Sequence, residues 1–140
     1  MLYNRSIPQT NVIQVIAYPD VNQAAAWLSD AFGFSVRLRI GDHRVQLNVR
    51  EGAVIVRELR PDEINAHLGA GCSVTIRVED ADRHCQRARD HGARIAQEPC
   101  TFPYGERQYR ADDFAGYSWT FSQSVEDVQP EEWGGTAEQL

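Results

Sequence analysis

The sequence predicts an α+β protein made of two similar βαβββ modules. A β-branched segment, a helical pattern and a run of alternating strands occur in that order, and the order begins again about 60 residues later. Asp20 and Gly33 bound the first helical pattern, and Asp80 and Gly92 bound the second. Because the caps and the glycines recur together with the apolar residues, an internal duplication explains the pattern most simply.

The first module begins with a buried strand. Residues 12–18 are rich in Val and Ile and stop at Pro19, which is typical of a strand with both faces covered. Apolar residues then recur at helical spacing, which predicts a helix over residues 21–32. After it, segments that alternate apolar and polar residues between turns predict strands over residues 35–40, 45–49 and 53–56.

The second module repeats this order with a strand over residues 72–78 and a helix over residues 81–91. We expect a single domain over residues 1–140, because a chain of this length suffices for one core. The predicted parts are modules over residues 11–59 and 72–123, a connector over 60–71 with one helical turn, and an acidic tail over 124–140. Trp133 is expected to fix the tail to the body.

Composition and charge exclude several classes of protein. The formal charge of −6 is unfavourable for nucleic-acid binding, which relies on clustered Lys and Arg. The N-terminus has no basic segment followed by a long apolar stretch, and nowhere do about 18 apolar residues run together, so we expect neither secretion nor a membrane span. Cys72, Cys85 and Cys100 cannot all pair and lack Cys-x-x-Cys spacing, which favours reduced thiols and a cytoplasmic location.

A motif at the end of the second module resembles a known superfamily. The motif is Asp113-Phe114-Ala115-Gly116-Tyr117-Ser118-Trp119-Thr120-Phe121. With the duplicated order of elements and Phe-Gly-Phe at residues 32–34, it resembles the vicinal oxygen chelate superfamily of glyoxalases, bleomycin-resistance proteins and dioxygenases, in particular a bacterial branch called glyoxalase-like. The resemblance covers residues 11–123, although Phe114-Ala115 replaces the usual Pro-x step. It implies a curved mixed sheet around a cavity, a small-molecule ligand and a homodimer.

The same resemblance implies where a metal would be held. Enzymes of the superfamily place His, Glu or Gln on the first and last strand of each module, where these residues bind a divalent metal. The corresponding positions here are Ile13, Val56, Ser73 and Thr120. None of these side chains is an imidazole, thiolate or carboxylate, and a one-residue shift of the alignment also gives no donor cluster. We therefore expect no metal and no cofactor.

Alternation along the strands predicts which side chains face the cavity. Trp119 and Phe121 share one side and are expected to pack against a helix. Gln46 is expected either to reach into the cavity or to lie exposed on the sheet. Tyr104, Glu106 and Tyr109 are expected in a loop at the mouth of the second module, after a Pro-Tyr-Gly turn. The residues predicted to line the cavity on the strands are Ile13, Val15, Val54, Val56, Ser73, Thr75, Ser118 and Thr120.

No catalytic residue is assigned. His43 is the best histidine candidate for acid-base chemistry, with a surface position at a strand end as the alternative. His84 and His91 are seven residues apart on one side of the second helix, where packing or solvation explains them. His67 is expected at the surface of the connector. Glu106 has no second carboxylate or base spaced to work with it, which favours binding over catalysis.

Three hypotheses for function remain open. The first is a metal-independent small-molecule binding protein of the bleomycin-resistance type, with sequestration of a drug or metabolite as its role. The second is a metal-dependent lyase, isomerase or dioxygenase with unusual ligands, for which His43, Glu58 and Glu106 are the conceivable donors. The third is a protein whose dimer or hetero-partner carries the function while the cavity is vestigial. The sequence does not name the ligand.

Overall fold

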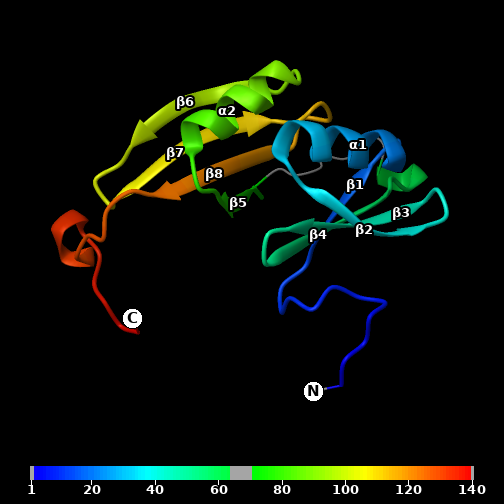
Figure 1. The fold of residues 1–140 in the computed structure, drawn as a ribbon, viewed down its shortest axis with the longest axis horizontal. Coiled ribbons are helices and arrows are strands. Elements are labelled where there is room, and N and C mark those ends of the chain that lie inside the picture. Colours follow the sequence, from blue (N-terminus) through cyan, green and yellow to red (C-terminus); the bar gives the residue numbers. More distant parts are fainter. Residues whose placement is uncertain (1, 64–70, 140) are drawn as a thin grey trace. The chain divides into compact units, whose positions relative to one another are not determined.

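The computed structural model describes residues 2–63 and 71–139. The chain divides into two compact units, residues 1–70 and residues 71–140. Each unit contains one α-helix and one sheet of four strands, and in each the helix lies over one face of its own sheet (Figure 1). Most of the predicted connector, residues 64–70, and with it His67, lies outside the described residues.

The first unit follows the predicted order of elements. Strand β1 (Gln14–Tyr18) leads into helix α1 (Val21–Phe32). The carboxylate of Asp20 accepts a hydrogen bond from the backbone N–H of Gln23 at 2.9 Å, which satisfies a donor that the first turn leaves unpaired. Gly33 ends the helix with a φ of 80°, a conformation in which a side chain would be strained.

The first sheet has the strand order β1-β4-β3-β2. Strands β1 and β4 are parallel, and the other neighbours are antiparallel. A short 3₁₀ turn, η1 (Pro61–Glu63), follows β4 and agrees with the helical turn that the sequence predicts in the connector. The bounds of the three remaining strands are Ser35–Ile40 for β2, Arg44–Val49 for β3 and Gly52–Glu58 for β4.

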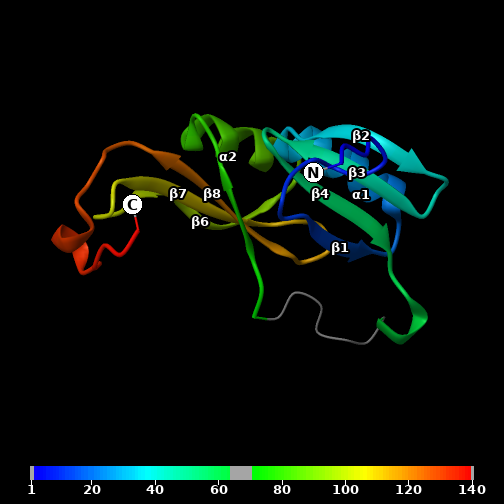
Figure 2. The ribbon, with the colours of Figure 1, turned by 90° about the horizontal axis from the view of Figure 1, so that it is seen from below.

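The second unit repeats this topology with the order β5-β8-β7-β6 (Figure 2). The carboxylate of Asp80 caps helix α2 by accepting from the backbone N–H of Arg83 at 3.0 Å. The elements are β5 (Val74–Arg77), α2 (Ala81–Asp90), β6 (Arg94–Thr101), β7 (Glu106–Asp112), β8 (Ser118–Ser124) and a 3₁₀ turn η2 (Pro130–Trp133). The two units confirm the predicted α+β fold of two βαβββ modules.

Strand pairing separates a helix-covered face from an open face on the first sheet. Val54 pairs with Gln14 and Leu47, and Val56 pairs with Ile16 and Val45. The valines and Leu47 are buried in the layer on which α1 packs. Val15 pairs with Ile55 and lies on the open face. The prediction that Val54 and Val56 share a face with Val15 is therefore wrong by one residue along β4.

The second sheet has the faces that the sequence predicts for its last strand. Trp119 pairs with Val74, and Phe121 pairs with Ile76 and Tyr109. Trp119 and Phe121 are completely buried on the helix-covered face, which confirms their predicted packing role. The side chains of Thr75 and Thr120 pair with each other on the open face.

The segment that the sequence assigns to a loop is a strand from Glu106 onward. Residues 106–112 form β7 in the middle of the second sheet, paired with β6 and β8. The prediction of a loop at Glu106 and Tyr109 is therefore wrong. The reason is that Tyr109 and Ala111 are the only apolar residues of β7. Two apolar residues are too few to show the alternating pattern by which a strand is recognised in a sequence.

A turn before β7 holds the beginning of the C-terminal tail. The backbone N–H groups of Val125 and Glu126 both donate to the carbonyl oxygen of Gly105. Gly105 has a φ of +83°, and a Cβ placed on it would lie 2.3 Å from the carbonyl oxygen of Glu126. The close approach of two backbone segments therefore requires glycine at this position.

Neither helix in the described ranges has the length and apolar character needed to span a membrane.

Gly105→Ala is expected to destabilise the second unit more than Gly116→Ala does. Both glycines have positive φ values, but a Cβ at Gly116 meets no atom within 4 Å. Gly116→Ala should therefore cost only the left-handed penalty of about 1–2 kcal/mol. Gly105→Ala adds a backbone collision, so its free energy of unfolding, measured by urea denaturation, should fall clearly further. Equal losses in the two variants would contradict the close approach.

Candidate functional site

A group of polar side chains lies on the open face of the second sheet. We call it the polar face and define it by six residues of β5, β7 and β8. The strand register brings them together, because Arg77 and Gln108 both pair with Ser122, and Thr75 pairs with Thr120. The six residues are Thr75, Arg77, Glu106, Gln108, Thr120 and Ser122.

Hydrogen bonds connect much of the polar face into one chain. The hydroxyl of Ser122 donates to Oε1 of Glu106 at 2.6 Å and accepts from Nε2 of Gln108 at 3.0 Å. The hydroxyl of Tyr104 donates to Oε1 of Gln108 at 3.0 Å. At the end of β8, a guanidinium nitrogen of Arg77 donates to the hydroxyl of Ser124. These mutual bonds fix the orientation of the carboxylate and the amide.

The carboxyl group of Glu106 is held in its ionised form. Partial burial raises its pKa, but hydrogen bonds from Ser122 and Ser124 and the charge of Arg77 lower it by more. The net result is a pKa below the ordinary value of 4.5. Glu106 therefore offers a hydrogen-bond acceptor at neutral pH, and it is a poor proton donor for general acid catalysis.

Aromatic rings adjoin the polar face at its Tyr104 end. The rings of Phe102 and Tyr104 are stacked with centroids 5.4 Å apart, and the ring of Trp133 lies 5.2 Å from that of Tyr104. Trp133 is 47% exposed although it touches Tyr104. It thus links the tail to the second module, as the sequence predicts, and still leaves about half of its surface exposed.

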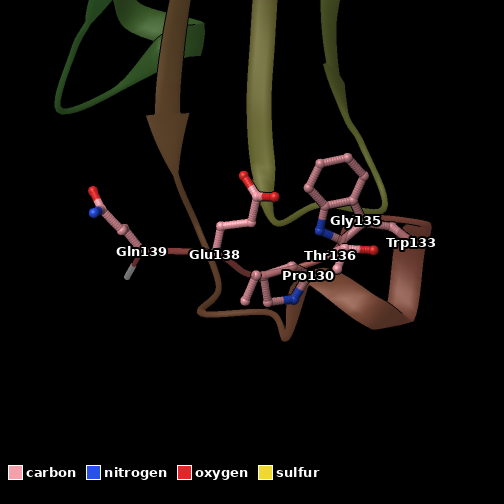
Figure 3. A pocket seen from close by; sticks show the side chains of 7 residues that line it. Pro130, Trp133, Gly135, Thr136, Glu138 and Gln139 are labelled. Carbon is pink, nitrogen blue, oxygen red and sulfur yellow. The ribbon is translucent and has the colours of Figure 1, made fainter.

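A shallow hollow in the tail lies against the same tryptophan. Its walls come from η2 and from the residues after it, and Figure 3 shows the Trp133 ring and the Glu138 carboxylate among its side chains. The lining residues are Pro130, Trp133, Gly135, Thr136, Ala137, Glu138 and Gln139. Glu138 is the one ionisable residue among them, so the hollow has no pair of groups for acid-base chemistry.

The donors on each open face do not fit the metal that the superfamily resemblance implies. On the second sheet the strand register places two carboxylates on the open face, Glu106 and Asp112. They stand six residues apart on β7, which is about 20 Å at roughly 3.3 Å per residue. The oxygen of Asp112 also accepts a 2.6 Å bond from Arg94. Within residues 2–63 and 71–139, no three His, Cys, Asp or Glu side chains are grouped so that they could hold a metal ion.

The other conceivable metal donors lie at one end of the first sheet. His43 is exposed in the turn before β3, and Glu58 is exposed at the end of β4. The backbone N–H of Glu58 donates to the carbonyl oxygen of His43 at 3.0 Å, so the two residues are neighbours through their main chains. Two donors without a third are too few for the closed or catalytic sites that divalent metals form with proteins.

The other residues that the sequence predicts to line a cavity lie at several places in the two units. Thr75, Ser118 and Thr120 are on the open face of the second sheet, as the alternation predicts. Ile13 and Ser73 precede the first strand of their modules. On the first sheet Val15 is 40% exposed, whereas Gln46 is 3% exposed and bonded to other parts of its own unit. Val54 and Val56 lie beneath α1, as described above.

Tyr109 belongs to the core of the second unit. Its side chain points to the helix-covered face and is completely buried, and its hydroxyl lies 2.5 Å from Nδ1 of His84 on α2. Burial raises the pKa of the Tyr109 phenol. The ring of His84 lies 4.2 Å from that of Phe121, which confirms the packing role considered for this histidine. Neither side chain is placed to meet a ligand on the open face.

Sequence reasoning missed Gln108 and left Arg77 and Ser122 out of the site. Alternation along β5 and β8 places Arg77 on the side of Thr75 and Ser122 on the side of Thr120, but neither side chain by itself indicates a chemical role. The alternation of Glu106, Gln108 and Arg110 would have placed Gln108 beside Glu106 if the segment had been read as a strand.

Removing the Ser122 hydroxyl should raise the pKa of Glu106. We expect carbon-13 NMR titration to give a Glu106 pKa below 4.5 in the wild type and a value closer to 4.5 in Ser122→Ala. Ser118→Ala, on the same face but bonded to neither group, should leave the pKa unchanged. Because the folded pKa is lowered, the stability that Glu106 contributes is complete above its unfolded pKa and disappears as the pH falls through the folded value. An unchanged pKa in Ser122→Ala would contradict the hydrogen-bonded chain.

Comparisons with known proteins agree with the fold. A family model described as the Glyoxalase/Bleomycin resistance protein/Dioxygenase superfamily matches residues 7–121. The structure is similar to that of TioX from Micromonospora sp. ML1, with 33% sequence identity, coverage of 83% of this chain and 99% of that chain, and a TM-score of 0.70. A search of curated proteins found no match.

Two further solved structures share the fold at low identity. A glyoxalase/bleomycin resistance protein/dioxygenase family enzyme from Burkholderia phytofirmans PsJN is 14% identical, with coverage of 81% of this chain and 97% of that chain and a TM-score of 0.69. A lactoylglutathione lyase from Agrobacterium tumefaciens is 17% identical, with coverage of 91% and 98% and a TM-score of 0.62. The family match over residues 7–121, on a duplicated βαβββ fold, places this chain in the glyoxalase/bleomycin resistance protein/dioxygenase superfamily.

Proposed function

We propose that the protein is a metal-independent small-molecule binding protein that sequesters a drug or metabolite. The observation that carries this proposal is the hydrogen-bonded chain of Tyr104, Gln108, Ser122 and Glu106 on an open sheet face. Such a chain presents amide, hydroxyl and carboxylate groups in fixed directions, which suits recognition of a polar ligand. It lacks the paired acid and base that a hydrolytic or isomerising site requires.

The aromatic side chains beside these hydrogen-bonded residues favour a ligand with both polar and aromatic parts. The stacked rings of Phe102 and Tyr104 and the half-exposed ring of Trp133 offer apolar area beside the polar face. Aromatic pairs in offset or edge-to-face geometry are worth about 0.5–1.5 kcal/mol beyond the area that they bury. We therefore propose that the ligand places a ring against Trp133 or Tyr104 and hydrogen-bonding groups against Gln108 and Glu106.

The proposal includes a homodimer and a cytoplasmic location. Val15 on β1 and Val36 and Ile40 on β2, the two edge strands of the first sheet, are each more than a third exposed, and exposed apolar side chains favour burial in an assembly. All three cysteines are free thiols, of which Cys72 and Cys100 are exposed. Exposed thiols suit a reducing compartment.

Elemental analysis together with solution mass tests the class and the assembly at once. Protein purified without chelator is expected to contain only substoichiometric metal, because no suitable donor group exists in the described ranges. Its mass in solution should be twice that of the 15.8 kDa chain. Stoichiometric Zn, Ni, Mn or Fe would contradict the proposal and favour a metal-dependent enzyme. A monomeric mass would refute the dimer alone.

Thermal denaturation with a panel of antibiotics and aromatic metabolites tests binding. A ligand that binds only the folded state should raise the stability by about 2.7 kcal/mol at a concentration of 100 times its Kd. Gln108→Leu should abolish the shift, because it removes the amide between Tyr104 and Ser122. Ser118→Ala serves as the matched control on the same face and should retain the shift. A panel without any shift would favour a protein whose assembly carries the function, and an equal shift in Gln108→Leu would place the ligand elsewhere.

A further inference from the structure

The N-terminal segment of the chain is bound to the open face of the first sheet. Residues 2–12 form neither helix nor strand, and Figure 1 shows them in dark blue on the side of the sheet opposite α1. Two of their backbone carbonyl groups, those of Arg5 and Ser6, accept hydrogen bonds from side chains of the sheet. The side chains are Arg37 of β2 and Gln46 of β3.

Arg37 and Gln46 hold each other in one orientation. Nη1 of Arg37 donates to Oε1 of Gln46 at 2.5 Å. This bond assigns the amide, because only a carbonyl oxygen can accept from the guanidinium, and the Nε2 group must then point the other way. Nε2 of Gln46 donates to the carbonyl oxygen of Ser6 at 2.9 Å, and Nη2 of Arg37 donates to that of Arg5 at 2.9 Å.

The pair therefore donates to two successive carbonyl groups in the middle of a turn, because the backbone N–H of Ile7 donates to the carbonyl oxygen of Asn4 at 3.4 Å. A backbone carbonyl is the same in every peptide, so these two bonds do not depend on the side chains of Arg5 or Ser6. Gln46 is 3% exposed in this arrangement, and both polar atoms of its amide have a partner.

Apolar residues surround the pair and complete the site. Gln46 pairs in register with Leu38 and Ile55, whose side chains share its face. Ile55 is buried, and Pro8 of the N-terminal segment is buried as well. The site thus combines two carbonyl-binding donors with an apolar neighbourhood, which matches the alternation of polar backbone and apolar side chains in a peptide.

The segment itself is weakly attached. Every other hydrogen bond that the structure describes for residues 2–12 stays inside the segment, such as that of the Gln9 amide to the carbonyl oxygen of Asn4. Two side-chain bonds hold it to the sheet, and Pro8 is the one buried residue among residues 2–12. A segment fixed by so few interactions opens at low free-energy cost and leaves the donors for another chain.

We propose that Arg37 and Gln46 form a binding site for a peptide turn that presents two successive backbone carbonyls, and that residues 5–6 of the protein itself fill this site until such a peptide displaces them. The site consists of residues of the first unit alone and does not depend on the polar face of the second sheet. A failure of ligand binding at Gln108 therefore leaves this proposal standing, and the reverse also holds.

A labelled peptide tests the proposal on the full chain. The probe is a capped, fluorescent peptide with the sequence of residues 4–9, and its binding is followed by fluorescence anisotropy. The wild type should bind it weakly, because its own segment competes. Pro8→Gly removes the buried ring and should bind the probe several-fold more tightly. Equal affinity of the two proteins, or no binding to Pro8→Gly, would overturn the proposal.

Matched changes to both partners separate carbonyl recognition from nonspecific adhesion. In the Pro8→Gly protein, Gln46→Glu keeps an acceptor for Arg37 but replaces the donor to the carbonyl with an oxygen, so the affinity should fall about tenfold or more. Arg37→Leu removes the other donor and should have a similar effect. A probe whose two recognised carbonyls are reduced to methylenes should fail to bind the unaltered site, which tests the same bonds even if a variant does not fold. An affinity that is the same with Gln46→Glu, with Arg37→Leu and with the reduced probe would overturn the proposal.

Discussion

One helix for each sheet is the constraint on which the rest of the structure depends. A four-stranded sheet has two faces, and each helix covers only one of them, so every strand must divide its side chains between a dry layer and an open face. Tyr18, Val56, Trp119 and Phe121 fill the dry layers and are almost completely buried. The open faces do not have to pack against a helix, and both the polar face and the Arg37–Gln46 pair lie on them.

The two open faces use this freedom in different ways, although their topology is the same. On the second sheet the positions around Ser122 carry hydroxyl, amide and carboxylate groups that bond one another. On the first sheet Leu38 and Ile55 lie beside Gln46, which is bonded to Arg37, and the charged residues Arg44 and Arg57 lie further along the same face. The same topology therefore occurs twice, and the two open faces carry different hydrogen-bonding groups.

Among the residues that the structure describes, neither open face groups three side chains that could hold a metal ion. The register shows that Val15 is beside Ile55 in the first unit just as Thr75 is beside Thr120 in the second, so the position that corresponds to Thr120 is Ile55, one residue before Val56. Matching Gly52 with Gly116 makes Val56 correspond to Thr120. The two glycines are not equivalent, because Gly52 is the first residue of β4 whereas Gly116 lies in the turn before β8. Hydroxyl and hydrocarbon groups at these positions suit a bound organic molecule.

The sequence by itself determined the order of elements, both helix caps and the superfamily, because these depend on local signals. Asp20, Asp80 and the helical spacing of apolar residues act within a few residues of the chain, and they appear in the structure where they were predicted. Only the tertiary structure decided the face of Val54, the strand at Glu106 and the partners of Gln46. Each of these depends on pairing between distant segments. A shift of one residue in the strand register turns every side chain of a strand to its other face, and a strand with few apolar residues is recognised only from the strands that pair with it. The bond from Gln46 to Ser6 joins residues that are 40 positions apart.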